Sequence, residues 1–576
     1  MKLMWHYTMR YKRLLVFDFI CVFGFILIEL GLPTILAWMV DEGIAKNNQA
    51  YIWQMGGLML GVILVGITLN ILLGYFTTRI TTNIVADIRD DLFAKIQTFS
   101  HQEYDELGVS SLITRVTNDA YQIMLFLQNF LRLGFMTPMM FLMSVYLVFK
   151  SSAQLGLIVL AALPILLIAV ILIAKFSEPL SIKQQKNLDK INGILRENLA
   201  GLRVIRAFVN EDFEEKRFAK VNHAYTKSSK GLFRLMAVTQ PGFFFLFNIV
   251  MVLIIWQGSI QIDQGQLLVG DLIAFIEYIF HALFSFMLFA SIFTMYPRAA
   301  VSASRIQEAL TTVPGIVENE PMLSAATARG IEFKQVTFAY PGHAQTPVIR
   351  DVNFSAKPGE TVAFIGSTGS GKSTLIQLIP RFYDVSDGEI LVNGVNVKAY
   401  SLRQLREKIG YIPQKAGLFS GTIAENLCYG KADATMAEMQ RAAEIAQASE
   451  FIERLPEKFA TELTEGGTNF SGGQKQRLAI ARAVIRQPEI YIFDDSFSAL
   501  DYQTDASLRA RLKQETENAI VLIVAQRVGT IMNANKIIVL DEGQVVGVGT
   551  HQELLKNCTI YYDIAASQLS KEELSL

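Results

Sequence analysis

Six long apolar segments in the first 300 residues limit what this chain can fold into. They lie near Leu14–Met39, Met55–Phe76, Phe126–Phe149, Leu155–Ile173, Leu235–Trp256 and Leu272–Tyr296. A helix needs about 20 mostly apolar residues to cross a bilayer, and each segment meets that length or comes close to it. Charged residues are sparser here than in the second half of the 576-residue chain. The sequence therefore predicts a membrane part followed by a cytosolic part, and it excludes one uniform soluble core.

The connections between these segments indicate how they are oriented. Most of the connecting Lys and Arg residues lie in two long connections, 77–123 and 175–236, whereas the short loops carry only Lys46 and Lys150. Cytoplasmic loops are enriched in Lys and Arg, so we expect the long connections and both termini in the cytoplasm. Apolar residues recur at helical spacing from Ile191 to Ile205, which predicts that the membrane helices continue into the cytosol.

A few charged residues interrupt the apolar segments. Asp18 and Glu29 lie in the first, Arg132 in the third, and Glu277 with His281 in the sixth. Charge is costly inside a bilayer, so such residues usually face a cavity or a partner group. Glu277 and His281 are four residues apart and share a helix face. They face either transported cargo or polar groups between helices, whereas Asp18 lies near the cytosolic end of its segment.

Charge and cysteine usage exclude two further classes of protein. The formal net charge of −1 argues against a nucleic-acid binder, which needs uncompensated Lys and Arg. Cys21, Cys428 and Cys558 are scattered, which is typical of free thiols in a reducing compartment rather than a disulfide framework or a zinc site. The basic start is followed by an apolar stretch too long for a cleavable signal peptide.

A phosphate-binding motif lies in the second half of the chain. The apolar run Val362–Ile365 has strand character and leads into a match to G-x-x-x-x-G-K-[ST]. The motif comprises Gly366, Ser367, Thr368, Gly369, Ser370, Gly371, Lys372, Ser373 and Thr374. In such a loop the backbone N–H groups surround phosphate oxygens, Lys372 reaches the β- and γ-phosphates, and the Ser373 hydroxyl ligates Mg²⁺. The sequence therefore predicts ATP with Mg²⁺ as cofactors.

A second apolar run, Ile490–Phe493, ends in two carboxylates, Asp494 and Asp495. This pattern fits the strand whose terminal Asp494 holds Mg²⁺ in nucleotide-hydrolysing domains. Such a run is a weak signal by itself, and a core strand ending in a solvated carboxylate would explain it. Together with the phosphate loop it predicts a nucleotide site.

Between the two motifs lies Phe470-Ser471-Gly472-Gly473-Gln474, followed by the helix-like stretch Lys475–Arg486. Phe470–Gln474 resembles the ABC transporter signature L-S-G-G-Q, with Phe in place of Leu. The order of motifs is similar to that of an ABC half-exporter, in which one membrane domain is fused to one nucleotide-binding domain. The resemblance covers essentially the whole chain.

Further motifs match this family residue by residue. Gln414 matches the Q-loop, which implies a role in hydrolysis and at Mg²⁺, and Tyr340 matches the aromatic residue that stacks on adenine. Ser498–Asp501 resembles the D-loop, and Thr461–Gly467 resembles the exporter X-loop, with Glu465 at its acidic position. The segments Ser111–Ala120 and Glu197–Phe213 are similar to those beside the two coupling helices.

The resemblance implies a multi-domain fold. It places an all-α six-helix transmembrane domain with long cytoplasmic helix extensions over residues 1–310 and a linker over 311–330. An ABC nucleotide-binding domain then covers 331–576, an α/β P-loop ATPase with an α-helical signature subdomain. In the family the signature of one domain closes over nucleotide held by another, so Ser471, Gly472, Gly473 and Gln474 are expected to complete a site on a second half-transporter.

Two departures from the family concern hydrolysis. The family places a catalytic Glu after the magnesium Asp, where this chain has Asp495, one methylene shorter. The switch histidine is replaced by Gln526, which can donate a hydrogen bond to the γ-phosphate but cannot carry positive charge. This is the family's heterodimer pattern. It predicts that Asp495, Gln526 and Gln414 form a catalytic set that hydrolyses ATP slowly, with Ser373, Gln414 and Asp494 at the metal.

The expected function is ATP-driven export of amphipathic or hydrophobic compounds, of the multidrug type, from a bacterial plasma membrane. The expected partners are a second half-transporter, the lipid bilayer and small-molecule cargo, and no nucleic acid. Phe- and Met-rich spans suit adaptable apolar cargo, although lipid-facing surface explains them equally well. A lipid or peptide exporter is an alternative of the same class. An alternative from another functional class is a nucleotide-gated regulator that does not pump, because such a protein would also be expected to carry Asp495 and Gln526 at these positions.

Overall fold

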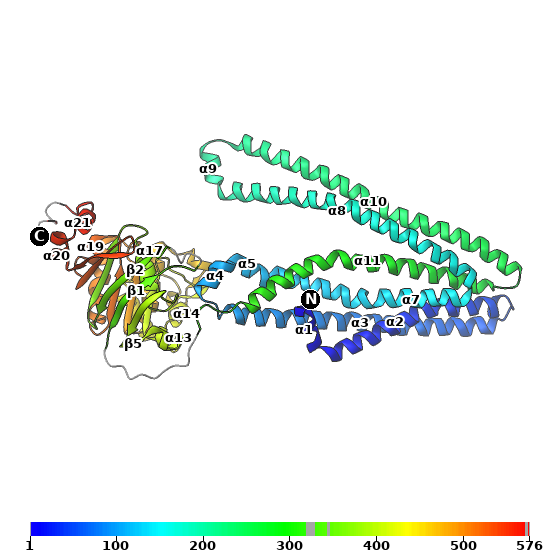
Figure 1. Ribbon diagram of the computed structural model, residues 1–576. Helices are drawn as coiled ribbons and strands as arrows, with labels where there is room; N and C mark the ends of the chain where they lie inside the picture. The colour runs from blue at the N-terminus through cyan, green and yellow to red at the C-terminus, as the bar shows by residue number, and fades with distance from the viewer. Residues whose placement is uncertain (1, 318–328, 342–345, 571–573, 575–576) are drawn as a thin grey trace. The chain divides into compact units, whose positions relative to one another are not determined.

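The computed structural model describes residues 2–317, 329–341, 346–570 and 574 (Figure 1). Its internal contacts divide the chain into two units. The first comprises Met1–Ile96 and Ser110–Thr311, and the second comprises Gln97–Val109 and Thr312–Leu576. Most of the predicted linker over 311–330 lies outside the described residues, at positions 318–328.

The first unit is entirely helical in its described part. Its elements are α1 (Lys2–Arg10), α2 (Lys12–Trp38), η1 (Met39–Ile44), α3 (Gln49–Ile96), α5 (Val109–Thr114), η2 (Arg115–Asp119), α6 (Ala120–Asn129), η3 (Phe130–Gly134), α7 (Phe135–Ser151), α8 (Ala153–Ala200), α9 (Leu202–Ala207), α10 (Glu211–Asp263) and α11 (Val269–Thr311). Six continuous helical stretches among the described residues are long and apolar enough to cross a membrane. The prediction of six membrane-spanning helices is confirmed.

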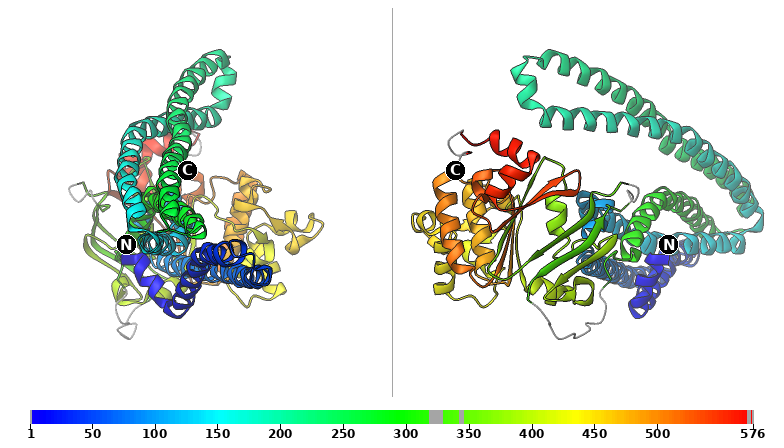
Figure 2. Two further views of the ribbon diagram at one scale, coloured as in Figure 1. Left: turned by 90° about the vertical axis from the view of Figure 1, so that its right-hand side faces the viewer. Right: turned by 60° about the vertical axis from the view of Figure 1, so that its left-hand side comes forward.

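Several of these helices are much longer than a bilayer requires. Helix α3 has 48 residues and α10 has 53. At 1.5 Å per residue, 48 residues span about 72 Å, against a hydrocarbon core of about 30 Å. Helices α8 and α10 run side by side and are joined through the short α9 (Figures 1 and 2). Asn187 on α8 donates its side-chain N–H to Oγ of Ser228 on α10 at 3.0 Å, so part of this pairing is polar.

The core of the first unit lies between α2, α3, α7 and α11. It is filled by aliphatic and aromatic residues such as Val22, Ile26, Leu73 and Phe275. Some of the buried polar groups beside it are paired, as unpaired polar groups away from water are costly. Asp18, for example, is 2% exposed and accepts a hydrogen bond from Thr77 at 2.6 Å.

The second unit contains two main sheets. An antiparallel sheet has the order β2 (Ile349–Ala356), β1 (Ile331–Phe338), β4 (Asp387–Val392) and β5 (Val395–Asn396). The larger sheet has the order β12 (Gln544–Gly549), β11 (Lys536–Asp541), β3 (Thr361–Gly366), β10 (Ile520–Val524), β9 (Ile490–Asp494) and β6 (Ile409–Ile412). All neighbours in the larger sheet are parallel except β11 and β12. The small strands β7 (Gly421–Thr422) and β8 (Glu462–Leu463) pair with each other.

Helices surround these sheets. They are α4 (His101–Leu107), α12 (Lys372–Gln377), η4 (Val397–Ala399), α13 (Leu402–Glu407), α14 (Ile423–Cys428), α15 (Met436–Ile445), α16 (Ser449–Glu453), η5 (Lys458–Ala460), η6 (Glu465–Gly467), α17 (Gly472–Val484), α18 (Tyr502–Glu515), α19 (Val528–Ile531), α20 (His551–Asn557) and α21 (Thr559–Ala566). The helices α14 to α17 lie between β6 and β9 in the chain and form the predicted helical subdomain around the signature. The α/β domain is therefore as expected.

Helix α4 belongs to the second unit although it comes from the first part of the chain. Its first residue, His101, stacks on Phe382 with ring centroids 4.6 Å apart. Asp105, one turn later, accepts a hydrogen bond from the hydroxyl of Tyr383 at 3.3 Å. The helix begins with a capping box between Ser100 and Glu103, which satisfies backbone N–H groups at its start.

Candidate functional site

The predicted nucleotide motifs meet at one edge of the larger sheet. Strands β3, β10 and β9 are adjacent and parallel, with Ile523 opposite both Ala363 and Phe493. The segments that follow these strands therefore emerge at the same carboxyl edge, which is where open α/β sheets bind ligands. These segments are the phosphate loop, the Asp494–Asp495 pair and the turn that carries Gln526.

The phosphate loop owes its shape to glycines. Gly371 precedes α12 with φ of 93°, a left-handed conformation that side chains disfavour. A Cβ at Gly366 would lie 1.9 Å from the carbonyl oxygen of Leu540, so only glycine fits at the start of the loop. Lys372 is 8% exposed, and its ammonium donates to the carbonyl of Ser367 at 2.7 Å. Burial lowers the pKa of Lys372, opposed by the nearby carboxylates Asp495 and Asp494.

Ser373 and Asp494 come together as predicted for a metal site. The Ser373 hydroxyl donates to Oδ1 of Asp494 at 2.7 Å, and the hydroxyl of Tyr411 donates to Oδ2 at 3.1 Å. Asp494 is 4% exposed, and this burial raises its pKa while the two hydrogen bonds oppose the rise. Tyr411 was not predicted as a site residue, although it lies in the same tetrapeptide as Gln414.

This arrangement fits a magnesium nucleotide. A hydroxyl and a carboxylate are oxygen donors of the kind that Mg²⁺ prefers, and Mg²⁺ usually takes only one or two protein ligands beside phosphates and water. A buried ammonium and backbone N–H groups at a helix start suit phosphate oxygens. Bound there, the metal would neutralise charge on the phosphates. Within the described residues no group of three or more His, Cys, Asp or Glu side chains could hold a metal ion by itself.

Asp495 is the centre of a second cluster. Gln414 and Gln526 both donate their side-chain N–H groups to its Oδ2, at 3.2 and 3.1 Å. Asp495 has a φ of 47° and is 8% exposed, and burial raises its pKa. All three predicted catalytic residues therefore meet at one carboxylate oxygen. The role of Gln414 at the metal stays a prediction, because its contact here is with Asp495.

Tyr340 lies beside the phosphate loop. Its hydroxyl is 2.9 Å from Oγ1 of Thr374, and its ring meets that of Tyr383 edge-on, with centroids 5.3 Å apart. The sequence did not predict the link to Thr374, since these residues are 34 positions apart. Stacking of this ring on adenine stays a prediction.

The signature residues form the start of α17. Ser471 and Gln474 make a capping box, in which the Ser471 N–H donates to Oε1 of Gln474 at 2.9 Å. Ser471 and Gly472 are exposed, so the helix start is open to a ligand or to another chain. In the segment that resembles the D-loop, Asp501 caps the start of α18 and accepts a hydrogen bond from the Thr504 N–H at 2.9 Å.

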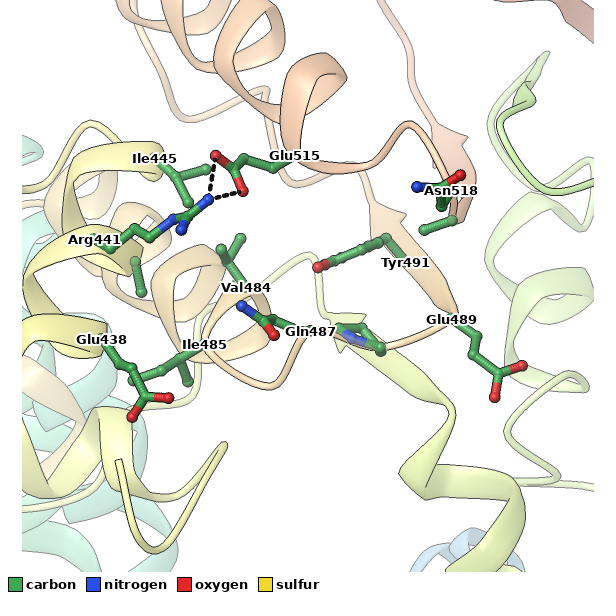
Figure 3. Close-up of a pocket in the computed structure, with 13 residues that line it drawn as sticks. Glu438, Arg441, Ile445, Val484, Ile485, Gln487, Glu489, Tyr491, Glu515 and Asn518 are labelled. Carbon is green, nitrogen blue, oxygen red and sulfur yellow. Dashed lines mark hydrogen bonds and ion pairs between the residues drawn. The ribbon is translucent and has the colours of Figure 1, made fainter. Parts of the chain in front are cut away.

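A further cavity of about 350 Å³ lies away from these motifs, between α15, α17 and the end of α18 (Figure 3). Arg441 crosses it and donates two hydrogen bonds to Glu515, at 3.1 and 2.9 Å. Its other carboxylates are also paired, Glu438 with Lys431 and Glu489 with Lys408. The charged side chains that line this cavity are therefore paired within the chain.

Comparisons with known proteins agree with the fold. The profile of the ABC transporter transmembrane region matches residues 15–287, and the profile described as ABC transporter matches residues 349–498. An uncharacterized ABC transporter ATP-binding protein of Mycobacterium tuberculosis (strain ATCC 25618 / H37Rv) is 39% identical over 563 residues, covering 97% of this chain and 96% of that protein.

A candidate export ATP-binding/permease protein of Rickettsia prowazekii (strain Madrid E) is 31% identical, with 98% of each chain covered. A solved structure of a bacterial Atm1-family ABC exporter with ATP bound has a similar fold, with a TM-score of 0.80 and 23% identity. It covers 97% of this chain and 99% of that one. The chain therefore belongs to the ABC transporter family, with the family's transmembrane region and ATPase domain fused in one multi-pass membrane protein.

Proposed function

We propose that the chain is one half of a dimeric ATP-driven exporter in a bacterial plasma membrane. Its nucleotide-binding domain and both termini would lie in the cytoplasm, as the Lys and Arg in the long connections indicate. The pairing of Ser373 with Asp494 beside Lys372 supports MgATP as the nucleotide. The names of an exporter-type relative and an exporter of similar fold support the direction of transport.

The observation that carries the finer proposal is the Asp495 cluster. A carboxylate one methylene shorter than Glu, held by two glutamines, is poorly suited to polarise an attacking water, because general-base catalysis depends on reach. A misplacement of about 1 Å can cost on the order of a hundredfold in rate. This site would bind ATP firmly and hydrolyse it slowly.

A heterodimer follows from this arrangement. The signature, Ser471–Gln474, of which Ser471 and Gly472 are exposed, would complete a competent site on a partner that supplies Glu and His. The slow site would hold the two domains partly closed while the other drives the cycle. ATP binding would favour one arrangement of the membrane helices and hydrolysis would reset it, a population shift with nucleotide as ligand.

The proposed cargo is an amphipathic or hydrophobic compound, with a lipid or a peptide as alternatives. A regulator that changes shape with ATP but does not pump is the second candidate, because the same Asp495 cluster would suit a protein that binds ATP without rapid turnover.

Two experiments test the proposal. Pull-down of the tagged chain from native membranes in mild detergent should recover a second half-transporter with Glu and His at the hydrolytic positions. Recovery of this chain alone would contradict the heterodimer. Inverted vesicles should then take up an amphipathic dye with ATP but not with a non-hydrolysable analogue, and Lys372→Met should reduce uptake. ATP-dependent shape change without uptake would favour the regulator.

A further inference from the structure

A cavity of about 390 Å³ lies inside the first unit, within the size range of small-molecule sites. Residues from four of the six apolar stretches line it. Phenylalanine and methionine side chains form part of its wall, and polar side chains from several helices also line it. The polar groups that matter here are Glu29 on α2, Asn70 on α3, Asn129 on α6, Arg132 on η3 and His281 on α11.

Two of these groups, Glu29 and Arg132, carry opposite charges at helix positions expected inside a bilayer. Among the residues that the structure describes, the side chains of Glu29 and Arg132 form no ion pair or hydrogen bond with the protein. Two buried charged groups elsewhere in the same unit are paired. Asp18 binds Thr77, and Arg115 binds Glu308 at 2.8 Å. Glu29 is half-buried and Arg132 is exposed within this single chain, so both charges are open to a ligand, and unpaired charge is costly at membrane depth.

Local structure supports a functional role for Arg132. It lies on η3, a π-helical turn between α6 and α7. Such turns inside α-helices occur often at functional sites. The structure also separates the two residues of the sixth segment. His281 lines the cavity, whereas Glu277, one turn earlier, is exposed and is not part of the lining.

We propose that this cavity binds an amphipathic zwitterion, with its acid group at Arg132, its protonated amine at Glu29 and its apolar part against the phenylalanines and methionines. A purely cationic compound would leave Arg132 unpaired, and an uncharged one would leave both charges unpaired, which is costly in a low-dielectric site. The inference rests on the proposed function, because it names the class of cargo that the exporter would carry.

Three dansyl probes of similar size test this proposal. Nε-dansyl-lysine is a zwitterion, dansylcadaverine carries only the amine, and N-dansyl-6-aminohexanoic acid carries only the carboxylate. Binding is measured by fluorescence to the full-length chain in nanodiscs without nucleotide, with empty nanodiscs as the reference. The zwitterion should bind about tenfold more tightly than either single-charge probe.

Charge removal should then act selectively. Arg132→Gln should weaken binding of the zwitterion to the level of the cationic probe and leave that probe unchanged, and Arg132→Lys should restore part of the loss. Glu29→Gln should weaken only the probes with an amine. Glu277→Gln is the matched control, and it should change no affinity.

Equal wild-type affinity for all three probes would overturn the proposal, as would equal loss of all three in Arg132→Gln. Uptake of Nε-dansyl-lysine into inverted vesicles with ATP tests export separately. Selective binding without ATP-driven uptake would refute the proposed export and leave the binding site intact. ATP-driven uptake of the dye by a chain whose binding shows no charge selectivity would support export and refute the zwitterion site.

Discussion

Gln526 donates its side-chain N–H to Oδ2 of Asp495 at 3.1 Å, although the two residues are 31 positions apart in the chain. The contact exists because β9 and β10 are neighbours, so the segments that follow them emerge side by side. Asp495 and Gln526 stand where the family has Glu and His, so the two residues that differ from the family pattern contact each other.

Restoring the family residues should speed hydrolysis at this site. Asp495→Glu with Gln526→His lengthens the carboxylate by one methylene and supplies a group that can carry positive charge to the transition state. We expect ATP turnover at this site to rise by about tenfold or more, since about 1 Å of misplacement can cost on the order of a hundredfold. Phosphate release from the assembled transporter measures it. Adding Lys372→Met should remove the gain, and an unchanged turnover in the double variant would mean that another feature limits the site.

Two variants of Tyr340 separate its ring from its hydroxyl. Tyr340→Phe removes the contact with Thr374 but keeps the ring, so ATP affinity should stay within about threefold of wild type. Tyr340→Ala should weaken ATP binding by about tenfold, because stacking of one base on an aromatic side chain contributes about 1–3 kcal/mol. Displacement of a fluorescent nucleotide measures both. Tyr562→Ala, an exposed tyrosine on α21, is the control. Equal affinity of Tyr340→Ala and wild type would exclude adenine stacking there.

Acid should destabilise the second unit through His551, which is buried, and His101, whose ring stacks on Phe382. Burial lowers the pKa of His551, which lies 2.6 Å from the hydroxyl of Tyr561 through Nδ1. Burial likewise lowers the pKa of His101. Below a pH of about 6.5, these histidines bind protons in the unfolded chain but stay neutral in the folded chain. The free energy of unfolding therefore falls as the pH drops from this value toward the lower pKa of the folded state.

The variant His551→Gln keeps a polar group without this titration. It should reduce the drop in melting temperature between pH 7.5 and 5.5 by about 2 °C, measured by calorimetry of the full chain. Adding His101→Gln should reduce the drop further. A drop that is identical in wild type and the double variant would place the acid sensitivity elsewhere.

Replacing the side chains of Phe208 and Phe213, which lie beside α9, should uncouple ATP hydrolysis from transport. Phe208 and Phe213 are 78% and 58% exposed, so replacing them with Ser should leave the fold of the first unit unchanged. If they transmit domain closure to the membrane helices, transport per ATP hydrolysed should fall severalfold while ATPase activity persists. Phe93→Ser on α3, also 58% exposed, is the control. Unchanged transport per ATP in the Phe208 and Phe213 variants would count against this route of coupling.

Part of this molecule could be predicted from its sequence because local patterns determine it. Apolar length fixed the six membrane helices, and the motif between Gly366 and Thr374 determined the phosphate loop. The contacts of Asp495 could not be predicted, since they depend on the strand order β10-β9-β6, which brings Gln414 and Gln526 to one oxygen. The cavity in the first unit could not be predicted from the sequence either, because Glu29, Arg132 and His281 come from three separate helical segments.

The contribution of α4 to the second unit bears on how small a fragment could fold alone. A recombinant piece that starts at Thr312 would omit residues 97–109 and with them the His101 ring that covers Phe382. Tyr383 would lose its carboxylate acceptor on Asp105 in the same cut. A helix encoded at residues 101–107 thus contacts two aromatic residues of the ATPase domain, so a gene fusion that exchanged the catalytic half would also have to match this distant helix to the new aromatic surface.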